Sequence, residues 1–120
     1  DTYRNLKNFP EARTEAYKSL KYRPDDGNPY ILIGDLYAAS AKDCGSNELT
    51  QKVAYWAAVD KYYMAKRTDD KLAEIAQQRI NAYSKAFPSK ETIFFHGFKV
   101  GESYNVECWI NEATTVRASE

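Results

Sequence analysis

The stretch from Asn28 to Tyr37, which reads NPYILIGDLY, limits the possible folds of this chain more than any other. Pro29 suits the first turn of a helix, where its missing N–H leaves nothing unsatisfied, and Asn28 is a favourable N-cap residue. Apolar residues follow on almost every side, which predicts a helix buried on more than one face. Gly34 costs a helix about 1 kcal/mol relative to alanine. We expect the close approach of a second helix to compensate, on a docking stripe formed by Tyr30, Ile33, Gly34 and Tyr37.

The composition narrows the range of partners. The chain has 120 residues, which suits one domain, and its 17 basic residues balance 17 acidic ones. Nucleic acids and anionic membranes select basic surfaces, so neither is expected as the main partner. No apolar run approaches the ~20 residues of a transmembrane helix, and no membrane-spanning segment is predicted. Because the chain opens on Asp1, we interpret it as a fragment or a processed product.

The order of apolar and turn residues predicts four helices and a small C-terminal β-hairpin. The helices are expected over about 10–23, 29–41, 48–67 and 71–86, with an enlarged loop at about 42–48. Pro88 ends this helical part, residues 1–88. Residues 89–120 are predicted to form a short helix and a hairpin, with one strand from Tyr104 to Ile110 and the other from Thr114 to Arg117. Because a lone hairpin is marginal in water, we expect it to adhere to the helices through Phe94, Phe95 and Phe98.

An internal repeat underlies the helical part. A shift of 46 residues aligns Ala12 with Ala58, Tyr17 with Tyr63 and Tyr37 with Tyr83. Together with Ile33-Gly34 and Tyr37 on one helix, the residues Ala58, Tyr62 and Ala65 on the next, and Pro24 at the end of a unit, this pattern resembles the tetratricopeptide repeat (TPR), a helix–turn–helix unit of 34 residues. The loop at about 42–48 would hold the inserted residues. Ile80 replaces the expected small residue and Asp70 the closing proline, as in a variant or capping helix.

The TPR resemblance implies a mainly α fold, an α-solenoid fragment of about four helices in antiparallel hairpins, whose concave groove binds a protein segment. Carried over position by position, the groove would be lined by Asn28, Ile31, Asp35, Ala38 and Ala39 on the first helix, and by Glu74, Gln77, Asn81, Ser84 and Lys85 on the last. A plain solvated helix face is the alternative for the second set. Asp35 would repel an acidic peptide. The tail resembles the ends of uncharacterised, exported bacterial TPR-containing proteins, which favours the periplasm or the cell surface and assigns no activity.

Residues able to carry chemistry are few. Cys44 and Cys108 make no metal-ligand pattern, and they form either a disulfide, which would fit an exported protein, or two isolated buried thiols. His96 is the only histidine and has no His/Cys/Asp cluster around it in sequence. No phosphate-binding glycine motif occurs. The sequence therefore predicts no catalytic, cofactor or metal site.

Three hypotheses of function follow. The first is a non-enzymatic scaffold that binds a protein or peptide in its groove or docks in an assembly. The second is a structural role, in which residues 89–120 cap a longer solenoid by sealing its last apolar face. The third is an enzyme that uses His96 and Cys108 as a nucleophile pair, which requires the two side chains to lie within hydrogen-bond reach.

Overall fold

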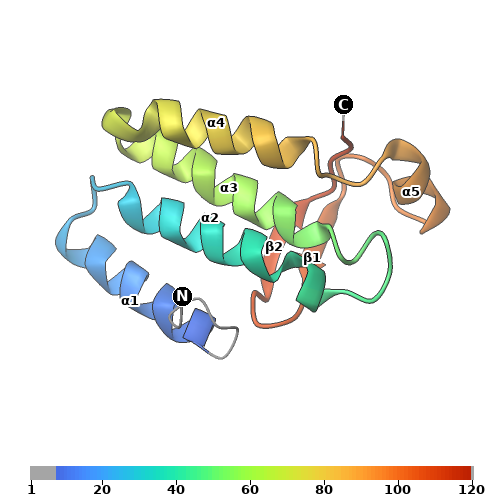
Figure 1. Ribbon diagram of the computed structural model, residues 1–120, viewed down its shortest axis with the longest axis horizontal. Helices are drawn as coiled ribbons and strands as arrows, with labels where there is room; N and C mark the ends of the chain where they lie inside the picture. Colours follow the sequence, from blue (N-terminus) through green and yellow to red (C-terminus); the bar gives the residue numbers. More distant parts are fainter. Residues whose placement is uncertain (1–7, 120) are drawn as a thin grey trace.

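The computed structural model describes residues 8–119, which form five α-helices and one two-stranded antiparallel sheet (Figure 1). Four helices lie side by side in chain order and alternate in direction: α1 (Phe9–Tyr22), α2 (Asn28–Ser40), α3 (Val53–Thr68) and α4 (Ala73–Ser84). The short 3-10 turns η3 (Ala41–Cys44) and η4 (Asp70–Leu72) follow α2 and precede α4. Then come α5 (Lys90–Phe95), β1 (Ser103–Val106) and β2 (Glu112–Thr115). The predicted fold class, mainly helical with a small C-terminal hairpin, is confirmed; residues 1–7 of the predicted helical part lie outside the described residues.

The core sits between α2 and α3, where small residues let the two backbones approach. A Cβ atom added to Gly34 would lie 2.6 Å from Cε1 of Tyr62, so only glycine fits this crossing without a shift. Ala58 and Ala65 of α3 are 0% exposed, as are the large side chains of Tyr37, Trp56 and Tyr62. The predicted compensation for the helical glycine, close contact with a neighbouring helix, is therefore confirmed.

Side-chain hydrogen bonds at two turns move helix starts away from their predicted positions. Asn28 is the first residue of α2 and not its N-cap, which is Gly27. The Asn28 side chain donates to Oδ1 of Asp26 (2.9 Å) instead of accepting from the helix. Before α3, the Asn47 side chain accepts from the backbone N–H groups of Leu49 and Thr50. This local turn competes with helix, and α3 begins at Val53 rather than near residue 48.

The hairpin is shorter than predicted. Val106 pairs with Glu112 at the end of the sheet, and residues 107–111 form the connecting loop. Cys108 and Asn111 have positive φ angles, 66° and 42°, in the left-handed region that a continuing strand cannot use. The prediction that Cys108 and Ile110 continue the first strand, and the predicted strand start at Thr114, were therefore wrong.

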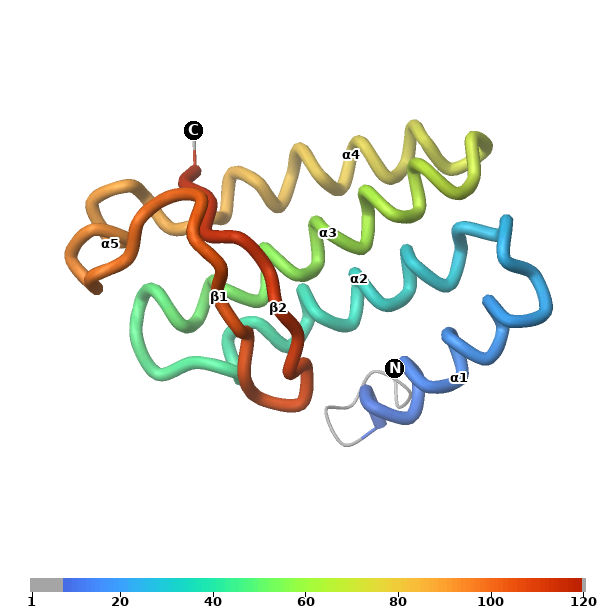
Figure 2. Tube along the Cα trace, turned by 180° about the vertical axis from the view of Figure 1, so that it is seen from behind, coloured from blue at the N-terminus to red at the C-terminus, as the bar shows by residue number. Residues whose placement is uncertain are grey.

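Figure 2 shows the hairpin lying across the helical layer near the C-terminal end of α2 and the N-terminal end of α3. Val106, Ile110 and Val116 are buried there in the same core as the helices. The expected adhesion through Phe94 and Phe95 is wrong, since these side chains are 83% and 81% exposed. The one-and-a-half turns of α5 bury Ile93 instead, which leaves the two residues that follow it facing solvent.

Phe98 packs edge-on against Tyr104 with ring centroids 5.3 Å apart, and so contributes as expected. Among residues 8–119, the structure has no helix that is both long and apolar enough to cross a bilayer.

Candidate functional site: the hollow between α2 and α4

The structure brings part of the predicted groove together in a hollow of about 320 Å³, which we call the α2–α4 hollow. Its lining combines three predicted residues of α2 with side chains from two other helices: Asp35, Ala38, Ala39, Tyr55, Arg79 and Tyr83. Ala39 is exposed and Ala38 is 8% exposed, so small side chains form one side of the hollow. The side chains of α2 are therefore small at this point and leave the hollow accessible to a partner.

A charged pair crosses this hollow. Oδ1 of Asp35 accepts a hydrogen bond from Nε of Arg79 at 2.9 Å and another from the hydroxyl of Tyr62 at 2.6 Å. The Asp35 side chain is 14% exposed and that of Arg79 33%. Burial, with a further contribution from Asp35, raises the pKa of Tyr62, so its hydroxyl remains a donor at neutral pH. Asp35 is thus held by two partners, and Arg79 offsets the repulsion that Asp35 alone would exert on an acidic peptide.

Three tyrosines form an aromatic wall beside the charged pair. Tyr83 stacks on Tyr55 with ring centroids 5.5 Å apart and on Tyr62 with centroids 5.9 Å apart. Burial raises the pKa of Tyr55, which keeps its ring neutral. Sequence reasoning missed Arg79 and Tyr83 because it assigned other residues of α4 to the groove, and it missed Tyr55 because it took no groove residue from α3. The repeat alignment contained a signal for Tyr83, its match to Tyr37, but gave it no role.

The predicted residues of α4 do not join the α2–α4 hollow. Gln77, Asn81, Ser84 and Lys85 line a separate hollow of about 350 Å³ with Tyr63 of α3. The amide oxygen of Gln77 accepts from Nζ of Lys66 at 2.5 Å, and its NH₂ group donates to Asn81 at 2.8 Å. Glu74 is exposed and lines neither hollow.

Helix geometry explains this separation. α4 packs through Ala76 and Ile80, which are 0% and 3% exposed. Successive residues of a helix are about 100° apart, so Gln77 and Asn81 lie on one side of the packed stripe. Arg79 lies on the opposite side, toward α2. The alignment carried over from the resemblance therefore turned α4 by the wrong angle.

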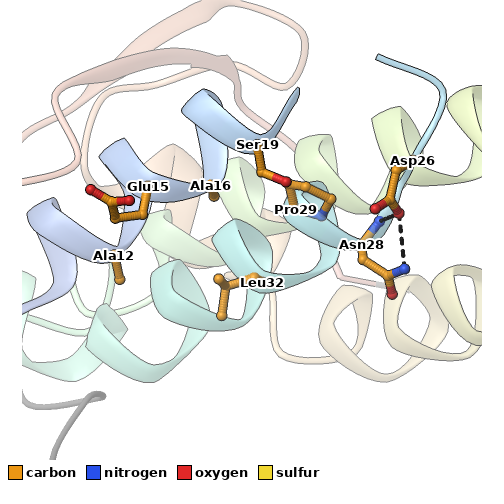
Figure 3. Close-up of a pocket in the computed structure, with 8 residues that line it drawn as sticks. All are labelled: Ala12, Glu15, Ala16, Ser19, Asp26, Asn28, Pro29 and Leu32. Atoms are coloured by element: carbon orange, nitrogen blue, oxygen red, sulfur yellow. Dashed lines mark hydrogen bonds between the residues drawn. The ribbon is translucent and has the colours of Figure 1, made fainter. Parts of the chain in front are cut away.

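The remaining predicted residues of α2 lie elsewhere. Ile31 is 9% exposed and belongs to the hydrophobic core, so it lines no groove. Asn28 lines a third and larger hollow, of about 550 Å³, between α1 and α2 (Figure 3). Nine of the ten groove residues carried over from the resemblance are thus divided among three hollows and the core, and Glu74 lies exposed outside them.

The two cysteines are joined. Cys44 at the end of η3 and Cys108 in the hairpin loop form a disulfide, with Cα atoms 5.4 Å apart. The alternative of two isolated thiols is wrong, and the free Cys108 thiol that a His96–Cys108 pair requires is absent from the structure. The ring of His96 packs edge-on against Phe95. Across residues 8–119, no three His, Cys, Asp or Glu side chains form a group that could hold a metal ion.

Two hydrogen-bonded clusters also fix the hairpin to the helices. In the first, Arg13 of α1 donates to the carbonyl oxygen of Ile110 (2.8 Å) and to the hydroxyl of Tyr37 (2.9 Å). Tyr37 in turn donates to Glu112 (2.9 Å), which also pairs with Lys61 at 3.1 Å. The hairpin is therefore tied to α1, α2 and α3 at once.

The second cluster centres on Arg117. Its guanidinium donates to the carbonyl oxygen of Trp56 at 2.9 Å and to Asp60 at 2.8 Å. In return, Nε1 of Trp56 donates to the Arg117 carbonyl oxygen at 2.8 Å. These reciprocal bonds lock the last residues of the described chain onto α3.

Comparison of this chain with protein-family models, with curated proteins and with solved structures finds no match in any of the three.

Proposed function

We propose that this protein is a non-enzymatic scaffold of the TPR type, and that it binds a peptide segment of a partner protein in the α2–α4 hollow. The repeat spacing and the order of four alternating helices support this proposal. The observation that carries it is the hollow itself, where exposed Ala39 lies beside stacked tyrosines and a charged pair. Tyrosine and arginine side chains are enriched at protein–protein interfaces.

The chemistry of the hollow indicates what the segment presents. An apolar side chain fits against Ala39, with Tyr55 and Tyr83 beside it. An arginine side chain has five N–H donors, and the Nε donor of Arg79 binds Asp35. A backbone carbonyl or a carboxylate of the segment would accept from the others. The proposed partner is therefore a peptide with one apolar anchor beside one hydrogen-bond acceptor.

Filling the hollow from its exposed alanine tests the proposal. A random peptide library displayed on phage would be selected on the wild-type protein, and the enriched peptides would be titrated against two variants. Ala39→Arg places a long side chain in the hollow, whereas Ala82→Arg adds the same side chain at an exposed position of α4 outside it. Peptides should bind Ala39→Arg at least tenfold more weakly and Ala82→Arg as they bind wild type. Equal binding to both variants would contradict the proposal.

These substitutions separate an effect on binding from an effect on stability, which charge reversal at Asp35 would not do. Asp35 accepts from both Tyr62 and Arg79, so its reversal would leave the buried Tyr62 and the half-buried Arg79 without their partner and lower stability. Charge reversal at Lys85, another predicted groove residue, would not probe the α2–α4 hollow, because Lys85 lines the separate hollow with Tyr63. The melting temperatures of Ala39→Arg and Ala82→Arg should both match that of wild type.

A structural role for residues 89–120 is the second candidate function, and the disulfide and two polar clusters favour it. We propose that this segment braces α1 to α3 from the side. It leaves Tyr63 of α3 and Ile75 of α4 uncovered, since these side chains are 42% and 40% exposed. Deletion of 89–120 would uncover Trp56 and should lower stability or cause aggregation. A deletion variant that stays monomeric and equally stable would refute the brace.

A further inference from the structure

An open hollow lies between α1 and α2, and its lining is mainly apolar (Figure 3). We call it the α1–α2 groove. It measures about 550 Å³. Ala12, Ala16 and Ser19 of α1 line one side, and Pro29 and Leu32 of α2 line the other. Both walls are helices, and the groove is open to solvent rather than a closed cavity.

The same chain contains a filled counterpart of this groove. A shift of 46 residues carries α1 onto α3 and α2 onto α4, so the pair α1–α2 corresponds to the pair α3–α4. The second pair holds a helix, namely α2. It contacts α3 where Gly34 meets Tyr62, and it contacts α4 through Asp35 and Arg79.

Side chains at positions of α1 and α3 that the 46-residue shift aligns differ in exposure, because a helix fills the second pair and none of the described helices fills the first. Ala58 and Ala65 of α3 are 0% exposed beneath α2. Their counterparts on α1 are Ala12, which is half-buried, and Ser19, which is exposed. The α1–α2 groove is thus a helix-packing surface that has no helix on it among the described residues.

We infer that the α1–α2 groove binds an amphipathic helix of a partner protein, one with a large apolar residue at its crossing point and basic residues at its flanks. The large residue follows from a reversal of sizes. In the filled pair, Tyr62 on the wall faces Gly34 on the inserted helix. In the open groove, Ala16 stands where Tyr62 would be, so the inserted helix must supply the bulk.

The basic flanks follow from the charges at the groove. Its charged lining residues, Glu15 and Asp26, are both acidic. Two hydrogen bonds from Asn28, one from its backbone N–H and one from its side chain, hold the pKa of Asp26 below its usual range. The Asp26 carboxylate is therefore ionised at neutral pH, and it favours a cationic segment. This surface shares no lining residue with the α2–α4 hollow, and the inference does not rest on the proposed function.

Synthetic helices based on α2 provide the probe. The first peptide copies residues 28–40 with Gly34→Leu, carries one lysine at each end and is labelled with fluorescein. A second keeps glycine at position 34, and a third replaces both flanking lysines with glutamates. In fluorescence anisotropy titrations at low salt, the first peptide should bind with an affinity about fivefold higher than that of each of the other two. The charge preference should fall at 0.5 M salt, since screening weakens exposed pairs.

Two protein variants locate the binding. Ser19→Trp fills the groove from an exposed position and should weaken the first peptide at least tenfold. Thr14→Trp places the same side chain at an exposed position of α1 outside the lining and should leave binding unchanged. Amide NMR shifts on titration should concentrate on Ala12, Ala16 and Leu32.

Several outcomes would overturn the inference. No saturation up to 1 mM peptide would do so, as would equal binding by Ser19→Trp and Thr14→Trp. Tighter binding of the glycine peptide would refute the reversal of sizes, and tighter binding of the glutamate peptide would refute the charge argument. If the groove resonances shift with protein concentration in the absence of peptide, a second copy of the chain is the occupant instead.

Discussion

Loss of the Cys44–Cys108 disulfide should lower the free energy of unfolding by about 4 kcal/mol. The bond joins positions separated by 64 residues, and the closed loop contains α3, α4, α5 and β1. In the chain-entropy account, closing a loop of this length removes that much conformational freedom from the unfolded chain. For a domain of this size, the melting temperature should fall by roughly 15 °C. Such a loss is a large share of the stability of a typical domain.

Urea unfolding of the Cys44→Ser/Cys108→Ser double variant measures this cost. Trp56 is 0% exposed in the core and reports global unfolding by its fluorescence. The m value should rise in the variant, because an unfolded chain without the bond exposes more surface. Wild-type protein treated with a reductant provides the control, and it should unfold at the same urea concentration as the variant.

A loss below about 1 kcal/mol with an unchanged m value would refute this reasoning. It would mean that the unfolded loop is already restricted by residual structure. A reduced wild-type protein that remains more stable than the double variant would instead assign part of the effect to the serine side chains. Mass measurement with and without reductant establishes that the bond is present in the starting sample.

Three further predictions concern the helical layer and α5. Gly34→Ala should cost about 1–3 kcal/mol in urea unfolding despite its better helix propensity, because the added carbon would lie 2.6 Å from the Tyr62 ring; unchanged stability would contradict the close crossing. Phe94→Ser/Phe95→Ser should stay within about 0.5 kcal/mol of wild type, because both side chains are exposed, and a larger loss would place them in a contact. Burial raises the pKa values of Tyr37 and Tyr62 above that of an unfolded tyrosine, so stability should hold up to about pH 10 and decline above it. Urea midpoints from pH 8 to 11 test this, and Tyr62→Phe should show a shallower decline.

The helical layer could be predicted because its signals are local. Gly34 within an apolar helix indicated a close crossing, and the structure places that crossing on Tyr62. The angle of α4 about its own axis could not be predicted in the same way. Ala76 and Ile80 form the packed stripe of α4. Which residues beside this stripe turn toward α2 is decided by packing between helices, and the spacing of residues within one helix does not determine it.

The candidate site and the hairpin attachment depend on contacts between distant residues. Arg13 binds the carbonyl oxygen of Ile110 across 97 positions of sequence, and Arg79 reaches Asp35 across 44. No periodicity within a segment encodes such pairs. The positive φ angle of Cys108 could not be predicted either. Cysteine has no preference for that region, and the residues around Cys108 alternate as in a strand.

α2 contributes residues to both candidate binding surfaces. The extent to which α2 is buried determines whether binding at one surface can change affinity at the other. Pro29 and Leu32 line the α1–α2 groove, whereas Asp35, Ala38 and Ala39 line the α2–α4 hollow. Eight of the 13 residues of α2 are buried between its neighbours. A helix packed this fully can shift only if the core on both sides repacks. Binding at one surface should therefore leave affinity at the other unchanged, because coupling requires a second arrangement of the helix that both partners could favour.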